Sequence, residues 1–215
     1  MAEPVVYGAA YSVYVRIVRL ALAEKGVDYR LEEVDVFAEG GPPPEHLGRH
    51  PFGRIPAFAH DGFALYEAGA IARYVDEAFP GPALQPTEPR ERARMNQIVS
   101  IVDGYAYRTL VWEIFVERVR KPQQGAASEE AAIAAALPRA RTCLAALADL
   151  AGPGDFLVGG RLGLADLHAA PMFVYFLMTP EGQAMWPEFP RLQAWWRAMA
   201  QRPSLAVTRS PLEAQ

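Results

Sequence analysis

The stretch His50-Pro51-Phe52-Gly53-Arg54-Ile55-Pro56 decides the fold, because it ends with a proline at the start of an apolar strand. A proline at that place removes a hydrogen-bond donor from the strand ladder. A cis peptide bond before Pro56 is one reason to keep it, since such a bond turns the chain and exposes the backbone of Ile55. An extended peptide can then pair with Ile55 as an added strand would. An ordinary proline-glycine loop entering an edge strand explains the stretch equally well.

The chain before this stretch predicts a strand, a helix and a second strand. Val5-Val6-Tyr7 is a short apolar run, and Tyr29 to Val36 alternates apolar and charged residues. Between them, Val13 to Lys25 carries apolar residues at helical spacing, with Ser12 as N-cap and Gly26 as the stop. This order is typical of a right-handed parallel crossover.

The chain after it predicts a hairpin and a helix. Ile55 to Ala59 and Phe63 to Leu65 flank Asp61-Gly62, a strong hairpin turn signal. Gly40 to Pro44 predicts a loop before the hairpin, and Glu67 to Phe79 predicts a helix after it.

A proline-rich segment, residues 80–89, predicts a linker between two domains. We expect a first α/β domain at 1–79 and an all-helical domain at 90–215. The helices predicted in the second domain are Arg90 to Val119, a Ser128-capped helix to about Leu150, Leu164 to Leu177 and Phe189 to Ala200.

Composition limits the classes of function. Half of the 215 residues are apolar, so a sizeable core can form, and a net charge of −4 argues against nucleic acid as a partner. We expect no bilayer-spanning run and no secretory signal at Met1 to Pro4, and with the single Cys143 this favours the cytoplasm. The four histidines lack paired spacing, so we expect no metal site.

Ser12 and Glu67 are polar residues at the starts of the two helices predicted in the first domain. The Ser12 hydroxyl can donate to a ligand thiolate, which the helix N-terminus stabilises further. Glu67, in Leu65-Tyr66-Glu67-Ala68-Gly69-Ala70-Ile71, opens a helix whose free N–H groups can hold a carboxylate. Glu67 itself can accept from a ligand ammonium group. Plain helix capping is the alternative at both positions.

These pieces, in this order and spacing, resemble the cytosolic glutathione transferase family over essentially the whole chain. His50 to Pro56 resembles its Asn-Pro-x-Gly-x-Val-Pro turn, and Leu65 to Ile71 its Glu-Ser-x-Ala-Ile motif. Gly163-Leu164-Ala165-Asp166 resembles the cap of its central helix, and Trp195 to Met199 with Arg202-Pro203 is similar to its usual ending. Ser12 falls where the serine-type classes (theta-, phi- and zeta-like) have their catalytic hydroxyl, and within the family the sequence resembles the bacterial type.

The resemblance implies a thioredoxin-like domain, an all-helical domain, a homodimer and glutathione as co-substrate, without a metal. Ser12 would stabilise the thiolate, Ile55 and Pro56 would hold the cysteinyl part of glutathione, and Glu67 and Ala68 its γ-glutamyl end. The family's serine is replaced by Ala68, and the loop that often contacts the glycine carboxylate has the sequence Gly40 to Pro44, which leaves Arg54 for that carboxylate. Tyr7 is a second candidate for the thiolate. Tyr11, Tyr105 and Trp112 are predicted to line the pocket for a small apolar electrophile.

We therefore predict a detoxifying glutathione transferase in which the thiolate attacks an electrophilic carbon. Two alternatives remain open: a non-catalytic relative that binds ligands, and a glutathione-dependent isomerase or dehalogenase. The isomerase signature Ser-Ser-Cys is absent, because Val13 and Tyr14 follow Ser12.

Overall fold

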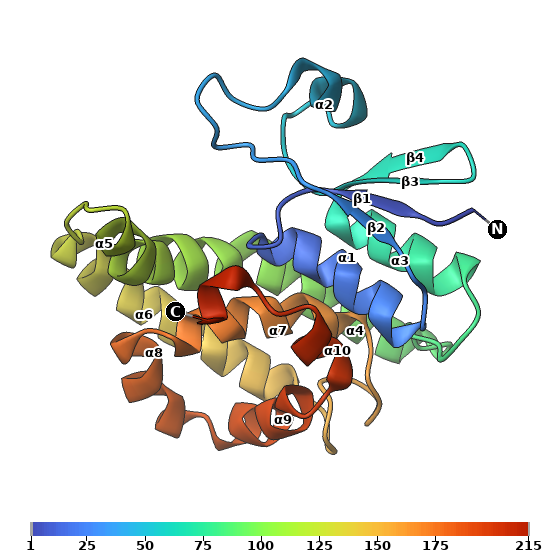
Figure 1. Cartoon of the computed structure of the whole chain (residues 1–215). Helices are drawn as coiled ribbons and strands as arrows, with labels where there is room; N and C mark the ends of the chain where they lie inside the picture. The colour runs from blue at the N-terminus through green and yellow to red at the C-terminus, as the bar shows by residue number, and fades with distance from the viewer. Residues whose placement is uncertain (1, 215) are drawn as a thin grey trace. The chain divides into compact units, whose positions relative to one another are not determined.

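The computed structural model describes residues 2–214 as two compact units. The first unit comprises the chain up to Gln85 together with the segment from Arg202 onward, and the second is Pro86–Gln201. Figure 1 shows the elements of both units in chain order.

The first unit is built on a four-stranded sheet of order β2-β1-β3-β4. β1 pairs parallel with β2, and β3 pairs antiparallel with both β1 and β4. This mixed sheet is the thioredoxin-like arrangement that the sequence predicts. The elements of the unit are β1 (Val5–Tyr7), α1 (Val13–Glu24), β2 (Arg30–Glu32), α2 (Pro44–Arg49), β3 (Ala57–His60), β4 (Phe63–Tyr66), α3 (Ala68–Ala78), α10 (Pro203–Val207) and η3 (Pro211–Ala214).

Local sequence signals correctly predicted helices α1 and α3 and the β3–β4 hairpin, but some strands and helices begin or end at other residues than predicted. β2 ends at Glu32 rather than at Val36, because its partner β1 ends at Tyr7. The last hydrogen bond between the two segments joins the Gly8 N–H to the Glu32 carbonyl oxygen at 2.9 Å. β3 begins at Ala57, after the proline that cannot donate. Helix α2 was not predicted; Pro44, which we assigned to a loop, occupies its first turn, where proline is well tolerated.

The C-terminal segment completes the first unit by supplying partners to polar side chains of α1. Arg16, buried at 2% exposure, donates to Glu213 at 2.6 Å and to the Leu205 carbonyl at 2.9 Å. Arg19 donates to the carbonyl of Thr208 at 3.2 Å. Because a buried guanidinium is costly without partners, these bonds are what permits charged residues on the inner face of α1.

The second unit is all helical and packs around α7, which is apolar on all sides as its sequence predicts. η1, α4 and α9 each contact α7, and η1 also contacts α6. The elements of the unit are α4 (Pro89–Ile101), η1 (Val102–Arg120), α5 (Lys121–Gln123), α6 (Glu130–Leu150), α7 (Leu164–Leu177), α8 (Pro180–Met185), η2 (Trp186–Glu188) and α9 (Pro190–Ala200).

Three features of the second unit differ from the sequence prediction. Val102–Arg120 is a π-helix, whose characteristic hydrogen bond joins an N–H to the carbonyl five residues back, as Lys121 N–H donates to Val116 O. Residue Glu129, not Ser128, precedes α6 as its N-cap. Among the described residues, α6 is also long and apolar enough to cross a bilayer, contrary to our expectation, although core helices meet the same criterion.

Candidate functional site

The sheet register brings the three predicted pieces of the site to one end of the first unit. Ala57 pairs with Tyr7 on one side and with Tyr66 on the other. From this row the chain leaves β1 toward Ser12 and leaves β4 toward Glu67, and it enters β3 from Ile55 and Pro56. Ser12, Ile55 and Glu67, which are far apart in sequence, therefore follow or precede strand ends that lie side by side at one end of the sheet.

Ser12 is the N-cap of α1, as predicted, and is half-buried. Its Oγ accepts from the Val15 N–H at 3.4 Å, a long bond that leaves the hydroxyl proton available for donation. The first turn of α1 contains no acidic residue. This helix N-terminus therefore carries partial positive charge with no side-chain anion of its own turn to offset it.

Tyr7, the second candidate for the thiolate, lies beneath an arginine. The guanidinium carbon of Arg49, from α2, lies 4.3 Å from the centroid of the Tyr7 ring. This cation–π contact gives the tyrosine ring a packing partner on the α2 side.

The backbone of Ile55 has an N–H and a C=O available for pairing with a ligand. The Ile55–Pro56 bond is cis, which is one of the two interpretations that the sequence left open. Ile55 lies against Gly8, where an added Cβ would be 3.2 Å from the Ile55 Cβ. Within the described residues, the N–H and C=O of Ile55 have no hydrogen-bond partner. An unpaired N–H and C=O on one residue is what an added peptide strand requires.

Glu67 precedes α3 in a backbone conformation that few residues with a side chain adopt, with φ of 72°. Its side chain makes no capping hydrogen bond, so the capping alternative at Glu67 does not hold. Ala68 follows as the buried first residue of α3, whose first turn has no acidic residue. Strained residues of this kind concentrate at functional sites.

His50 and Arg54 complete this end of the sheet. Burial lowers the pKa of His50, and the nearby carboxylate of Glu67 opposes that shift in part. The charges of Glu67 and Arg54 are thus both felt at the His50 ring, while the side chain of Arg54 is exposed. The loop around Gly40 and Gly41 offers no side-chain donor.

Tyr11 lies beside Ser12 in an aromatic pair that the sequence did not predict. Its ring stacks on Phe37 with centroids 6.4 Å apart, and its hydroxyl donates to Asp35 at 3.1 Å. Phe37 is 66% exposed, which is unusual for so large an apolar side chain. An exposed phenylalanine in a loop after a predicted strand was the available signal.

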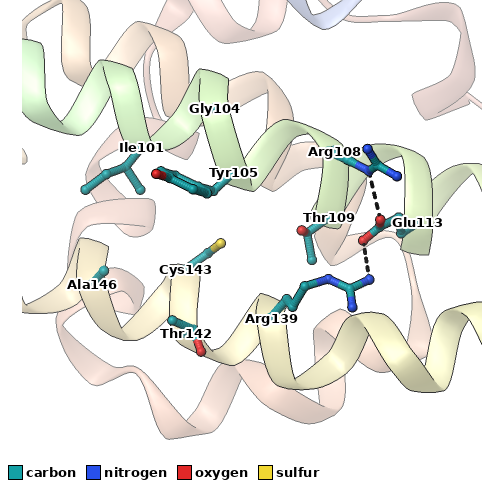
Figure 2. A pocket seen from close by; sticks show the side chains of 10 residues that line it. All are labelled: Ile101, Gly104, Tyr105, Arg108, Thr109, Glu113, Arg139, Thr142, Cys143 and Ala146. Carbon is teal, nitrogen blue, oxygen red and sulfur yellow. Dashed lines mark hydrogen bonds and ion pairs between the residues drawn. The ribbon is translucent and has the colours of Figure 1, made fainter.

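Tyr105 and Trp112, the other predicted pocket residues, line separate hollows of the second unit. Tyr105 lies in a groove of about 690 Å³ between η1 and α6, and Trp112 in one of about 470 Å³. Figure 2 shows the larger groove, with Arg108 and Arg139 converging on Glu113. Burial opposes ionisation of Glu113, but hydrogen bonds from the two arginines hold its pKa below the usual value.

Cys143 also lines the larger groove, and it is buried as expected. Burial raises the pKa of its thiol, which keeps it in the unreactive protonated form. In the part of the chain that the structure describes, no three His, Cys, Asp or Glu side chains gather as metal ligands do.

Comparison with known proteins gives matches along most of the chain. The sequence profile of the glutathione S-transferase N-terminal domain matches residues 6–83, and that of the C-terminal domain matches residues 100–203. Glutathione S-transferase 4 of Zea mays is 32% identical over 206 residues, covering 95% of this chain and 92% of the relative. The chain belongs to the glutathione S-transferase family. The residues around Ser12, Ile55 and Glu67 thus fall within the N-terminal glutathione S-transferase domain.

Two further matches extend across the family's two domains. Glutathione S-transferase F13 of Arabidopsis thaliana is 28% identical, covering 92% of this chain and 91% of the relative. The structure of maize glutathione S-transferase I in complex with an atrazine–glutathione conjugate superposes with a TM-score of 0.84 at 25% identity. The match covers 96% of this chain and 96% of the maize enzyme. The glutathione S-transferase fold predicted from sequence is therefore confirmed.

Proposed function

We propose that this protein is a glutathione transferase, in which the thiolate of glutathione attacks a small, apolar electrophile. The observation that carries the proposal is the convergence of the Ser12 hydroxyl, the unpaired Ile55 backbone and the α3 N-terminus at one end of the sheet. The family membership and the conjugate bound by the similar maize enzyme support it.

Ser12 is the proposed catalytic residue of the serine-type class. Its hydroxyl donates to the thiolate, and the N-terminus of α1 adds a favourable field. Lowering a thiol pKa by ~2 units needs about 3 kcal/mol of preferential stabilisation of the anion. A helix terminus contributes about 1 kcal/mol and a hydrogen bond to a charge about 1.5–3 kcal/mol, so the two together suffice.

The remaining groups hold the peptide. Ile55, with Pro56 behind it, pairs with the cysteinyl backbone as a short added strand. The N–H of Ala68 and the α3 N-terminus receive the γ-glutamyl carboxylate, while Glu67 accepts from the ammonium group. Arg54 is the proposed partner of the glycine carboxylate.

The electrophile is assigned to aromatic side chains of both domains. We propose residues 1–79 as the glutathione-binding domain, 80–89 as the linker and 90–215 as the domain that contributes the electrophile pocket. Tyr11 with Phe37 forms an aromatic wall beside Ser12, and Tyr105 and Trp112 are exposed on η1. Exposed aromatic rings of this kind are suited to a planar apolar substrate.

Conjugation of a chlorinated nitroaromatic by the purified protein tests the proposal. Replacement of Ser12 by alanine lowers the rate at neutral pH about 10- to 100-fold, because one hydrogen bond to a charge is lost. Glu88→Ala, which removes an exposed N-cap from α4, is the matched control and leaves the rate unchanged. Equal rates for wild type and Ser12→Ala exclude Ser12 from the mechanism.

A non-catalytic binding protein is the second candidate, favoured by Ala68 and by the Gly40–Gly41 loop, which lack the usual donors for the carboxylates of glutathione. Binding of glutathione in a calorimeter without turnover of any electrophile would support it. Conversion of a substrate without net consumption of glutathione would instead indicate the isomerase alternative.

The proposal includes a homodimer located in the cytoplasm. Phe52 and Phe63 of the first unit are large apolar side chains at 70% and 48% exposure, as residues of a subunit interface are before assembly. Light scattering coupled to size exclusion gives the mass directly. A monomeric mass at micromolar concentration contradicts this part of the proposal.

A further inference from the structure

His46 of α2 is buried completely and bonds to the backbone of the candidate site rather than to another side chain. Its Nε2 lies 2.7 Å from the carbonyl oxygen of Arg54, the residue before Ile55. Since a carbonyl can only accept, Nε2 carries the proton and donates. None of the roles proposed above uses this histidine.

The bond to Arg54 fixes the direction of the Ile55 N–H. The carbonyl of Arg54 and the N–H of Ile55 belong to one peptide unit, which is planar. Among the described residues only Ile55–Pro56 is cis, so the Arg54–Ile55 unit is trans and its C=O and N–H point in opposite directions. As His46 draws the carbonyl toward α2, the N–H is directed away from α2.

We propose that His46 is a positioning residue for glutathione, which it serves by holding the Arg54–Ile55 peptide plane. This role rests on the proposed function, because the group it aims is the N–H assigned to the cysteinyl carbonyl of glutathione. His46 itself touches no substrate. Without His46 the Arg54–Ile55 peptide unit can rotate. Glutathione binding must then include the entropic cost of ordering this peptide unit, which lowers the affinity.

His60 of β3 provides a matched comparison within the same unit. It is buried at 5% exposure, and one of its ring nitrogens makes a hydrogen bond while the other makes none, as in His46; that other nitrogen, Nε2, lies 3.5 Å from a carboxylate oxygen of Asp61. However, the bonded nitrogen of His60 lies 2.8 Å from the hydroxyl of Tyr74, a side chain. Both histidines are buried and make one hydrogen bond, but only the hydrogen bond of His46 goes to the turn that contains Ile55.

The test compares His46→Leu, His46→Gln and His60→Leu by calorimetric titration with glutathione and by steady-state kinetics. For His46→Leu we expect the Kd and the KM for glutathione to rise about tenfold, the equivalent of one neutral hydrogen bond. The kcat at saturating glutathione stays within about twofold, because Ser12 is unchanged. Replacement by Gln, whose amide reaches the same carbonyl, restores most of the affinity, and His60→Leu leaves the affinity unchanged.

A second variant keeps the test decisive if His46→Leu does not fold. His46→Asn keeps a polar amide, but its shorter side chain does not reach the carbonyl, so it is expected to behave as the leucine variant does. The amide signal of Ile55 in a nitrogen–proton correlation spectrum shifts in both variants and returns with Gln.

Different results would contradict the proposed function and the positioning role of His46. No heat when wild type is titrated with millimolar glutathione contradicts the proposed function. Heat for wild type, with the same Kd for a folded His46→Leu or His46→Asn, contradicts the positioning role alone. An equal loss of affinity in His60→Leu also contradicts it, because the effect then follows from general loosening of the unit.

Discussion

Helices α1 and α7 both begin with backbone N–H groups that no helical carbonyl accepts, but the chain treats their N-termini in opposite ways. At α7, Asp166 accepts from Gly163 N–H at 2.8 Å and from Leu157 N–H at 2.9 Å, and the indole of Trp195 donates to it at 2.8 Å. At α1, the first turn has no acid and only the long bond to Ser12. A helix closed by its own anion can only be structural, whereas one without an anion can receive a ligand.

The largest expected effect is the loss of the internal anion of α7. Asp166→Ala leaves three N–H donors without this acceptor, two of them buried, so we expect the free energy of unfolding to fall by about 3–5 kcal/mol. Denaturation in urea measures the change. Asp149→Ala, at an exposed position of α6, is the control and changes it by less than about 0.5 kcal/mol. A change as small as that of the control would contradict the role of Asp166.

Giving α1 an anion of its own is expected to abolish most of the activity. In Ser12→Asp the carboxylate stabilises the helix N-terminus but repels the thiolate, at a cost of about 4 kcal/mol for charges ~4 Å apart. The rate of conjugation should therefore fall about 100- to 1,000-fold while the melting temperature is maintained. An active Ser12→Asp enzyme would show that the thiolate lies elsewhere.

The pH dependence of stability measures what the buried anion of α7 costs. Burial raises the pKa of Asp166 to about 6, against the opposing effect of the hydrogen bonds that its carboxylate accepts. The folded protein therefore binds a proton at higher pH than the unfolded chain does, so lowering the pH from about 6 to 4 favours the folded state. Relative to Asp166→Asn, wild type should gain about 2–3 kcal/mol over this range in parallel urea titrations. A constant difference between the two proteins would contradict the raised pKa.

The smallest effect concerns α3, whose N-terminus resembles that of α1 in having no acid in its first turn. Ala68→Ser adds a hydroxyl donor beside the proposed γ-glutamyl carboxylate, so calorimetry should give a Kd for glutathione about tenfold lower. Ala70→Ser, at an exposed position two residues further along the helix, is the control. Unchanged affinity in Ala68→Ser means that the carboxylate does not bind at this terminus.

Local sequence signals predicted those parts of the site that depend on neighbouring residues. Ser12 as a cap, the turn at Asp61-Gly62 and the bond before Pro56 follow from backbone preferences of single residues. Helix α2 was missed because Pro42-Pro43-Pro44 suits both a loop and a helix start. Its histidine therefore could not be connected with Ile55.

Long-range pairing was the part that the sequence did not reveal. Arg16 and Arg19 interrupt the apolar pattern of α1, and nothing near them in sequence indicates that residues past 200 provide their partners. The hydrogen-bond pattern of η1 could not be predicted either, because the same apolar spacing is compatible with hydrogen bonds to the fourth or to the fifth preceding residue.

The return of the C-terminal segment to α1 has a consequence for synthesis on the ribosome. The first unit emerges first, but Arg16 obtains the Leu205 carbonyl and Glu213 only after Pro86–Gln201 has been translated. At about 5–20 residues per second this delay is on the order of ten seconds. Throughout it the nascent first unit lacks the carbonyl and carboxylate partners of Arg16, so synthesis of the segment from Arg202 onward, rather than of the domain boundary, is the step after which this unit can become fully stable.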